Sequence, residues 1–240
     1  MTYNVHRCVG MDGKLNLDRT ARVIAQCRPD VVALQELDVG RMRTGMVDQA
    51  HAIAELVGMR FHFHPALRVE EESYGDAILS TVPMRLLKAG PLPGSNAVRG
   101  LEPRGALWVK VELDGAEVDI VNTHLGLVPH EQRAQADALI GQQWMAHADC
   151  TDPAILLGDF NATPQHGAYR RIAGRLRDAQ AGRVRGRLRT FPSRFPMLRI
   201  DHVFISRSIH VTGVHAPRNA LTRAASDHLP LLVDFRIEQA

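Results

Sequence analysis

The stretch Leu156-Leu157-Gly158-Asp159-Phe160-Asn161 places polar side chains directly after an apolar run. The run Ala154–Leu157 predicts a buried strand, because short apolar runs of this length are typical of strands covered on both faces. In extended backbone, residues i and i+2 point to the same side, so Asp159 and Asn161 would project together beside a glycine. That pairing suits a hard cation and an attacking water. The alternative is an ordinary Asx turn at a strand end, and a short motif alone does not decide between the two.

Apolar runs and helical patterns alternate on both sides of this stretch. Helices are expected at Asp18–Cys27, with Asp18 as N-cap and Pro29 as the stop, at Val47–Val57, ended by Gly58, and at Glu131–Ala146. An Asp114-Gly115 turn predicts a hairpin between two of the strands. Strands are expected at Thr2–His6, Val31–Leu34, Arg60–His64, Tyr74–Ser80, Leu107–Leu113, Val118–Thr123, Ala154–Leu157, Arg199–Ser206, Val211–His215 and Leu231–Ile237. Helices interspersed with hairpins favour an α/β fold with mixed sheets.

Length and composition are those of one globular domain over residues 1–240. Hydrophobic residues make up 45% and charged residues 23% of the chain, which is enough for a sizeable core. The net charge of +3 and the sequence pI of about 9.0 permit an anionic partner without requiring one. We expect a monomer.

The cysteines and the apolar runs bear on the compartment. Cys8, Cys27 and Cys150 have no metal-like spacing, and an odd, scattered set argues against a disulfide framework, so we expect reduced thiols in a cytoplasmic protein. No run approaches the ~18 apolar residues of a membrane span, and no signal-peptide pattern opens the chain. The first predicted strand starts at once, at Thr2, which leads us to expect a short upstream piece and weakens the prediction of a compartment.

Other predicted strands also end in groups that carry chemistry. Glu36 follows the run Val31–Leu34, and a carboxylate there is a natural Mg²⁺ ligand, because Mg²⁺ takes one or two carboxylates along with waters and substrate phosphate. His124 follows Val121-Asn122-Thr123, and histidine is the side chain best matched to proton transfer near neutral pH. Each has an ordinary alternative: a solvated strand end for Glu36 and a structural histidine for His124.

Two later segments add carboxylates and a histidine. Asp201 begins an apolar run, where a carboxylate would orient the imidazole of another segment and fix its tautomer. In Ser226-Asp227-His228 the carboxylate and the imidazole are adjacent, so they would point in different directions, one toward a metal and one toward the phosphorus. The alternative is a loop before the last strand. Together with Asn4 in the first strand, these groups would converge on one rim of the sheets. Oxygen and imidazole donors without cysteine pairs favour magnesium or manganese over structural zinc.

The order of these motifs resembles that of the endonuclease/exonuclease/phosphatase superfamily, which includes pancreatic-type deoxyribonuclease, abasic-site endonucleases, bacterial sphingomyelinases and inositol polyphosphate phosphatases. The resemblance spans nearly the whole chain and implies a four-layered α/β sandwich with two central mixed sheets. It also implies a metal-dependent phosphoesterase that uses Mg²⁺, with Mn²⁺ as a substitute, and in-line attack by water. It is carried by Asn4, Gln35-Glu36, Asn122-Thr123-His124, Gly158-Asp159-Phe160-Asn161, Arg199-Ile200-Asp201-His202 and Ser226-Asp227-His228.

The resemblance implies a role for each matching residue. Glu36 would bind the divalent metal, with Asn4 nearby on metal or phosphate and Asp227 at or near a metal. Asp159 would orient or deprotonate the attacking water, and Asn161 would help to hold phosphate and nucleophile.

The matching histidines would act on the scissile phosphate and the leaving group. His228 would contact the scissile phosphate, steered by Asp201. His124 matches the histidine that protonates the leaving oxygen in the deoxyribonuclease-like branch. Asp76 stands where that branch has a supporting glutamate; the alternative for this shorter side chain is a solvated strand start. Asn122 is expected among the phosphate-binding groups, with Asn4, Asn161 and His228.

The substrate is open among several phosphate esters. The segment Arg175–Arg199 reads as a long basic surface loop in which Phe191 and Phe195 lie between arginines. Arginine binds phosphate and aromatic rings stack on bases, so this segment modestly favours nucleic acid. The alternatives are an ordinary solvated loop, a phospholipid or inositol-phosphate substrate, and a catalytically silent phosphate-binding module.

Overall fold

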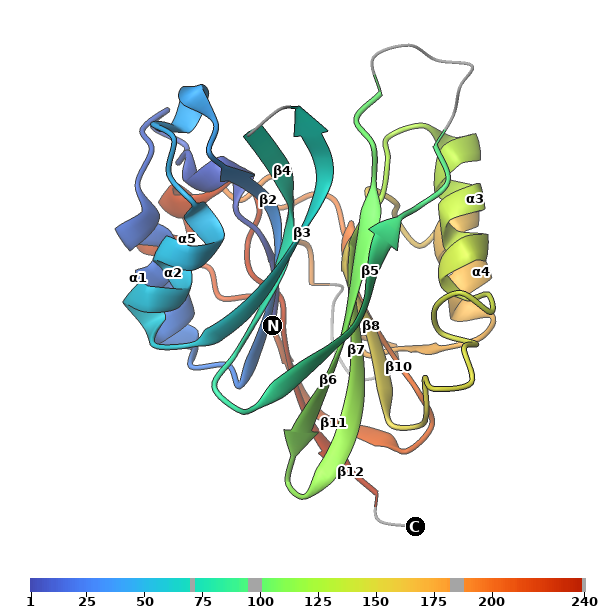
Figure 1. Ribbon diagram of the computed structural model, residues 1–240. Helices are drawn as coiled ribbons and strands as arrows, with labels where there is room; N and C mark the ends of the chain where they lie inside the picture. Colours follow the sequence, from blue (N-terminus) through green and yellow to red (C-terminus); the bar gives the residue numbers. More distant parts are fainter. Residues whose placement is uncertain (70–71, 95–100, 182–187, 239–240) are drawn as a thin grey trace.

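Two mixed sheets lie face to face between two layers of helices, as a computed structural model of the protein shows (Figure 1). The structure describes residues 1–69, 72–94, 101–181 and 188–238. This arrangement is the predicted four-layered α/β sandwich. Hydrophobic cores fill all three spaces between the layers.

The first sheet holds the N-terminal strands and has the order β1-β2-β4-β3. Strand β1 pairs parallel with β2, and β4 pairs antiparallel with both β2 and β3. Helices α1, α2 and α5 pack on its outer face through one apolar cluster. The bounds are β1 (Thr2–Asn4), β2 (Val31–Val39), β3 (Arg60–Val69), β4 (Glu72–Ser80), α1 (Leu17–Cys27), α2 (Gln49–Val57) and α5 (Ala220–Ala225), with short 3₁₀ helices at His6–Cys8 and Met42–Thr44.

The second sheet has the order β5-β6-β7-β8-β10-β9, with β7 and β8 parallel and the other pairs antiparallel. Helices α3 and α4 cover its outer face (Figure 1). A two-stranded sheet, β11-β12, is linked to β1 by a bridge between Thr2 and Leu231. The bounds are β5 (Met84–Pro91), β6 (Gly105–Leu113), β7 (Ala116–His124), β8 (Ala154–Asp159), β9 (Arg177–Asp178), β10 (Asp201–Ile205), β11 (Ile209–His215), β12 (Leu232–Ile237), α3 (Pro129–Leu139) and α4 (Gly167–Ala173).

The three predicted helices are present with shifted boundaries: α1 begins at Leu17, α2 at Gln49 rather than Val47, and α3 at Pro129 rather than Glu131. The side chain of Asn16, not Asp18, caps α1 by accepting the backbone N–H of Arg19 at 2.8 Å. Helix α3 ends at Leu139 rather than continuing to Ala146. Gly141 has low helix propensity, and the turns that follow it bury Trp144 against the second sheet, which a continuous helix would carry away.

The segment predicted as a long basic surface loop is only partly one. Arg199 is buried and forms an ion pair with Asp178, while Arg177 belongs to strand β9 and donates to backbone carbonyls. Phe195 is exposed, as predicted. The prediction was wrong for these two arginines because local composition does not show which arginine pairs with a buried carboxylate. The middle of the segment, residues 182–187, lies outside the described residues.

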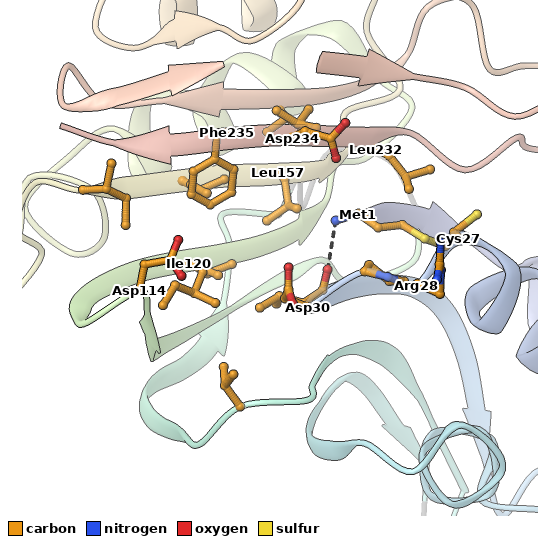
Figure 2. Close-up of a pocket in the computed structure, with 18 of the residues that line it drawn as sticks. Met1, Cys27, Arg28, Asp30, Asp114, Ile120, Leu157, Leu232, Asp234 and Phe235 are labelled. Carbon is orange, nitrogen blue, oxygen red and sulfur yellow. Dashed lines mark hydrogen bonds between the residues drawn. The ribbon is translucent and has the colours of Figure 1, made fainter. Parts of the chain in front are cut away.

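A cavity of about 340 Å³ opens at the end of the sandwich where β2 and β8 begin (Figure 2). Aliphatic side chains of the central core, such as Ile120 and Leu157, line it together with Phe235. The amino nitrogen of Met1 lies at its edge and donates to the carbonyl of Val31 at 2.9 Å. The strand ends with the predicted site residues lie at the opposite end of the sheets.

The remaining predictions about the whole chain have mixed outcomes. Cys8, Cys27 and Cys150 are free thiols, as expected. Among the described residues, no helix is both long and apolar enough to cross a bilayer. The monomeric state and the cytoplasmic compartment stay predictions.

Candidate active site

The polar residues predicted at strand ends converge where β1, β7 and β8 finish, beside the middle of β2. Asn4 lies opposite Gln35 in the first sheet, and His124 lies opposite Asp159 in the second. Strand β10 runs antiparallel to β8, so its first residue, Asp201, also pairs with Asp159. The topology therefore brings residues far apart in the sequence to one edge of both sheets.

Asn4 joins the two sheets at this edge. Its side-chain nitrogen donates to Glu36 Oε1 at 2.9 Å and to Asp159 Oδ2 at 3.0 Å. Its side-chain oxygen accepts the backbone N–H of His6 at 3.0 Å. Because the amide is 1% exposed and bonded at both ends, its orientation is fixed.

Glu36 reaches the site through an irregularity inside β2, not through a strand end as predicted. Its φ is 62°, and the pairing register of β2 with β4 shifts between Leu34 and Leu37. A bulge of this kind adds an unpaired residue and redirects a side chain. Glu36 is half-buried, so its carboxylate remains accessible from solvent.

Gly158 allows β8 to lie close against β7. Its φ is 149°, and a Cβ at this position would lie 1.9 Å from the carbonyl oxygen of Thr123. Asp159 is 1% exposed, and its Oδ1 accepts the backbone N–H of Asn161 at 2.9 Å. The Asx turn considered for this motif is therefore present, and it orients the carboxylate within the site.

His228 and Asp201 form a buried pair. His228 Nδ1 lies 2.9 Å from Asp201 Oδ2, and His228 Nε2 lies 3.6 Å from Asp159 Oδ2. The hydroxyl of Thr190 donates to the same oxygen of Asp201, and the ring of Phe191 packs 4.9 Å from the imidazole. The predicted orientation of His228 by Asp201 is thus present as a direct contact.

Burial and these neighbours shift the ionisation of both partners. Burial lowers the pKa of His228, but the carboxylates of Asp201 and Asp159 outweigh it and raise the pKa to about 10. Burial raises the pKa of Asp159 well above its ordinary value, with a further contribution from Asp201 and opposition from His228. His228 is therefore an imidazolium at neutral pH.

His124 has a different partner from the expected one. Its Nε2 lies 3.6 Å from Asp159 Oδ2, but its Nδ1 is 3.1 Å from Nη1 of Arg104. Asp76, expected to support His124, accepts the backbone N–H of Glu36. Burial raises the pKa of Asp76 to about 7, while the charge of Arg104 opposes the shift. The predicted support of His124 by Asp76 is not seen among the described contacts.

Asn122 and Asp227 occupy unlike positions. Asn122 is fully buried; its nitrogen donates to the carbonyls of Leu34 and Ala77, and its oxygen accepts from Gln35. These bonds join the two sheets and argue against the predicted contact of Asn122 with phosphate. Asp227 is half-buried, and its neighbour Ser226 donates to the carbonyl of Asn4 at 2.7 Å.

The donor set fits a hard cation better on one side of the site than on the other. Asp159, Asp201 and His228 present ligand atoms within 4.8 Å of one another. Nδ1 of His228 contacts Asp201 and its Nε2 faces Asp159, so carboxylates already occupy both ring nitrogens, and this trio suits proton and phosphate chemistry. The accessible carboxylate of Glu36 beside Asn4 offers the oxygen ligands that Mg²⁺ takes.

Sequence reasoning missed Arg104 and Thr190. Arg104 directly precedes the apolar run that forms β6, and a charged residue beside a buried strand was a usable signal. Thr190 lies within the basic segment, where composition pointed to a surface loop. Its contact with Asp201 depends on long-range packing that no local pattern encodes.

Comparisons with known proteins find relatives over nearly the whole chain. The uncharacterized protein YbhP of Escherichia coli is 25% identical over 254 residues, an alignment that covers 99% of this chain and 95% of that protein. A solved endonuclease/exonuclease/phosphatase from Beutenbergia cavernae superposes with a TM-score of 0.77 at 26% identity, covering 99% of this chain and 70% of its own. A mannosyl-6-phosphatase of Bacteroides thetaiotaomicron shares the fold, with a TM-score of 0.76 at 21% identity over 98% of both chains.

The sequence matches the Endonuclease/Exonuclease/phosphatase family over residues 1–228. That match covers the elements that bear the site, from Asn4 to His228. The chain therefore belongs to the endonuclease/exonuclease/phosphatase family, a family of phosphoesterases.

Proposed function

We propose that this protein hydrolyses a phosphate ester by in-line attack of water, assisted by a divalent cation. One observation carries the proposal: the contacts run unbroken from Glu36 through Asn4 and Asp159 to His228 and Asp201. A module that only bound phosphate would need cationic donors, but not a buried carboxylate between two histidines. The silent alternative is therefore less well supported.

Asp159 is the group proposed to orient the water and take its proton. Its raised pKa brings its basicity closer to the working pH, which is what a general base requires. The imidazolium of His228 and the amide of Asn161 are proposed to hydrogen-bond the phosphate oxygens. Because these groups are fixed by buried neighbours, they need little reorganisation during the reaction.

Glu36 is proposed as the main ligand of the cation, with Asn4 beside it and Asp227 at or near it. Mg²⁺, with Mn²⁺ as a substitute, would supply charge neutralisation at a phosphate oxygen when bound. Asn4 keeps the carboxylate of Glu36 in place and separates it from that of Asp159, so two acidic groups share the site with a donor between them.

Nucleic acid is the substrate class that we propose first. The exposed ring of Phe195 follows Arg194, and Arg189 is also exposed on the segment that carries Phe191 to His228. An aromatic face next to guanidinium groups suits stacked bases and their phosphates. The solved neighbours include the human Nocturnin catalytic domain and a TDP2 protein; at 21% and 18% identity they support the fold rather than the substrate.

A phospholipid is the second candidate, favoured by exposed apolar side chains. Leu127 follows β7 directly beyond His124 and is 69% exposed, and Met197 near the start of β10 is 68% exposed. Apolar side chains on loops that leave the site end are suited to an interface with lipid.

The test is a panel of phosphate esters assayed with Mg²⁺, with Mn²⁺ and with chelator. The panel holds plasmid, single-stranded DNA, RNA, a sphingomyelin vesicle, an inositol phosphate and a chromogenic diester. The controls are Asp159→Asn and His228→Ala. We expect metal-dependent cleavage that both substitutions abolish; folded protein that binds neither metal nor substrate would overturn the proposal.

A further inference from the structure

Arg104 contacts the side of His124 that faces away from Asp159. Its Nη1 lies 3.1 Å from Nδ1 of His124, and the arginine is 8% exposed. Nη2 of the same guanidinium forms an ion pair with the carboxylate of Glu102 at 3.4 Å. The contact therefore joins a buried, permanently charged donor to a site histidine.

The donors around the imidazole outnumber its acceptors. A guanidinium has N–H donors and no acceptor, and a neutral imidazole accepts at one nitrogen only. Asn161 Nδ2 lies 3.1 Å from the other nitrogen, Nε2 of His124, and donates to the carbonyl of Leu125 at 3.0 Å. Both contacts with the imidazole thus present N–H groups, and His124 can accept only one of them.

Arg104 is the partner that keeps the acceptor nitrogen. Its charged hydrogen bond is the stronger of the two, and no rotation of a guanidinium gives it a lone pair. The amide of Asn161 keeps a partner in the carbonyl of Leu125 when Nε2 of His124 carries a proton, and that proton then faces the carboxylate of Asp159 at 3.6 Å. Nδ1 of His124 is then the lone pair that accepts from Arg104, and the proton resides on Nε2.

We infer that Arg104 is a positioning residue that holds His124 as a neutral imidazole with its proton on Nε2, so that His124 hydrogen-bonds an ester oxygen without acting as a general acid. The role at the ester oxygen rests on the proposed function; the tautomer rests on the contacts alone. This assignment differs from the proton-donating role that the sequence resemblance implies.

The surroundings of His124 agree with a neutral imidazole. Burial lowers the pKa of His124 well below its ordinary value, and the charges of Arg104 and His228 lower it further. Asp159, at 3.6 Å, is the nearby carboxylate on the Nε2 side. Two histidines of one site thus differ in charge, with His228 protonated and His124 neutral.

The tautomer is read directly from long-range ¹H–¹⁵N correlation spectra of the full chain with ¹⁵N-labelled histidine. A His124→Gln variant assigns the signal by its loss. At pH 7.5 we expect the pattern of an imidazole protonated only at Nε2, in the presence and absence of Mg²⁺. A proton on Nδ1, or an imidazolium at this pH, would overturn the inference whether or not the protein shows activity.

Arg104→Met removes the guanidinium and keeps much of the side-chain volume. We expect the pKa of His124 to rise by about 1–3 units and a proton to appear on Nδ1 in part of the molecules. Arg41→Met, which breaks a partly buried pair with Glu72, is the matched control and should leave His124 unchanged. Arg104→Lys keeps a charged donor and should preserve the wild-type pattern.

The same variants separate positioning from simple loss of structure. Unaltered His124 signals in folded Arg104→Met would refute the role of Arg104. If Arg104→Met does not fold, the wild-type spectrum and Arg104→Lys still decide the tautomer.

Discussion

At the end of the sandwich where β1, β7 and β8 finish, buried polar side chains bond one another, whereas at the opposite end aliphatic and charged side chains surround a cavity. Asn4, Asp159 and Asp201 are each 1% exposed and lie within one chain of contacts. Around the cavity, Ile120 and Leu157 belong to the apolar core, whose packing is non-directional, and charged side chains such as those of Asp30 and Asp234 lie at its lining as well. Hydrogen bonds fix positions closely, while apolar packing here leaves about 340 Å³ unfilled.

The contrast between the two ends separates residues that serve chemistry from residues that serve stability. Charged groups buried at the first end are costly unless paired, so their presence favours reactivity over stability. The second end contributes hydrophobic stabilisation through its aliphatic side chains. We therefore expect changes at the two ends to alter different measurements.

The largest effect is expected from Asp159→Asn. Losing the proposed base should lower kcat by about 10²–10⁴-fold. Because burial raises the pKa of this carboxyl, removing its charge should leave the melting temperature unchanged or higher. Kinetics and calorimetry of the variant check this, with exposed Asp149→Asn as the control. An Asp159→Asn variant as active as the wild type would contradict the assignment of reactivity to the polar end.

A pH series tests a polar group buried near the site without a carboxylate partner. His202 donates to the carbonyl of Ala162, and burial, aided by Arg199, lowers its pKa to about 4. The unfolded chain takes up its proton near pH 6.5 and the folded protein only near 4, so stability should fall as the pH drops through this window. The loss amounts to roughly 3 kcal/mol.

Urea unfolding of His202→Gln between pH 4 and 7 measures that loss. Glutamine keeps a donor for Ala162, so the slope attributable to His202 should disappear. Exposed His51→Gln should behave as the wild type. An unchanged slope in His202→Gln would mean that other buried groups cause the acid loss.

Asp201→Asn should have an intermediate effect on activity. We expect kcat to fall by about 10–100-fold, as for other residues that orient a site side chain. The protonated form of His228 is proposed to act, so wild-type activity should be lost as the pH rises toward a pKa of about 10. Without the Asp201 charge that limit should move to lower pH. The pH–rate profile of Asp234→Asn, which alters an exposed Asp–His pair near the cavity, should not move.

The smallest effect is expected from filling the cavity. Val203→Ile adds one methylene beside it and should stabilise the protein by about 0.5–1 kcal/mol without changing kcat. Val121→Ile makes the same change in the packed layer under α3, where overpacking costs about 1–3 kcal/mol. Denaturant midpoints of both variants check the contrast; equal effects would show that the cavity closes in solution.

The sequence predicted the site where local pattern and topology agree. Asp159 and His124 follow apolar strands, and strands of this fold class end on one rim, so their convergence followed from the strand assignments. The sequence pointed to Glu36 as a carboxylate near the site. The bulge that directs its side chain there was not predicted, because it depends on the pairing of β2 with β4. Arg104 and Thr190 were missed because their partners lie in other strands.

Asn122 shows a further limit of sequence reasoning. Its position two residues before His124 suggested a contact with phosphate. Its burial between the two sheets instead makes it a link between them. Depth follows from how two sheets stack, and no residue near Asn122 in the sequence reports it.

The bond between Asn4 and Asp159 spans 155 positions, and the one between Ser226 and Asn4 spans 222. The site is therefore assembled from the first and last parts of the chain, across two sheets that must already be stacked. During synthesis the site cannot form until the segment with Ser226 and His228 has emerged from the ribosome. Formation of the complete site is thus a late event in the synthesis of the polypeptide.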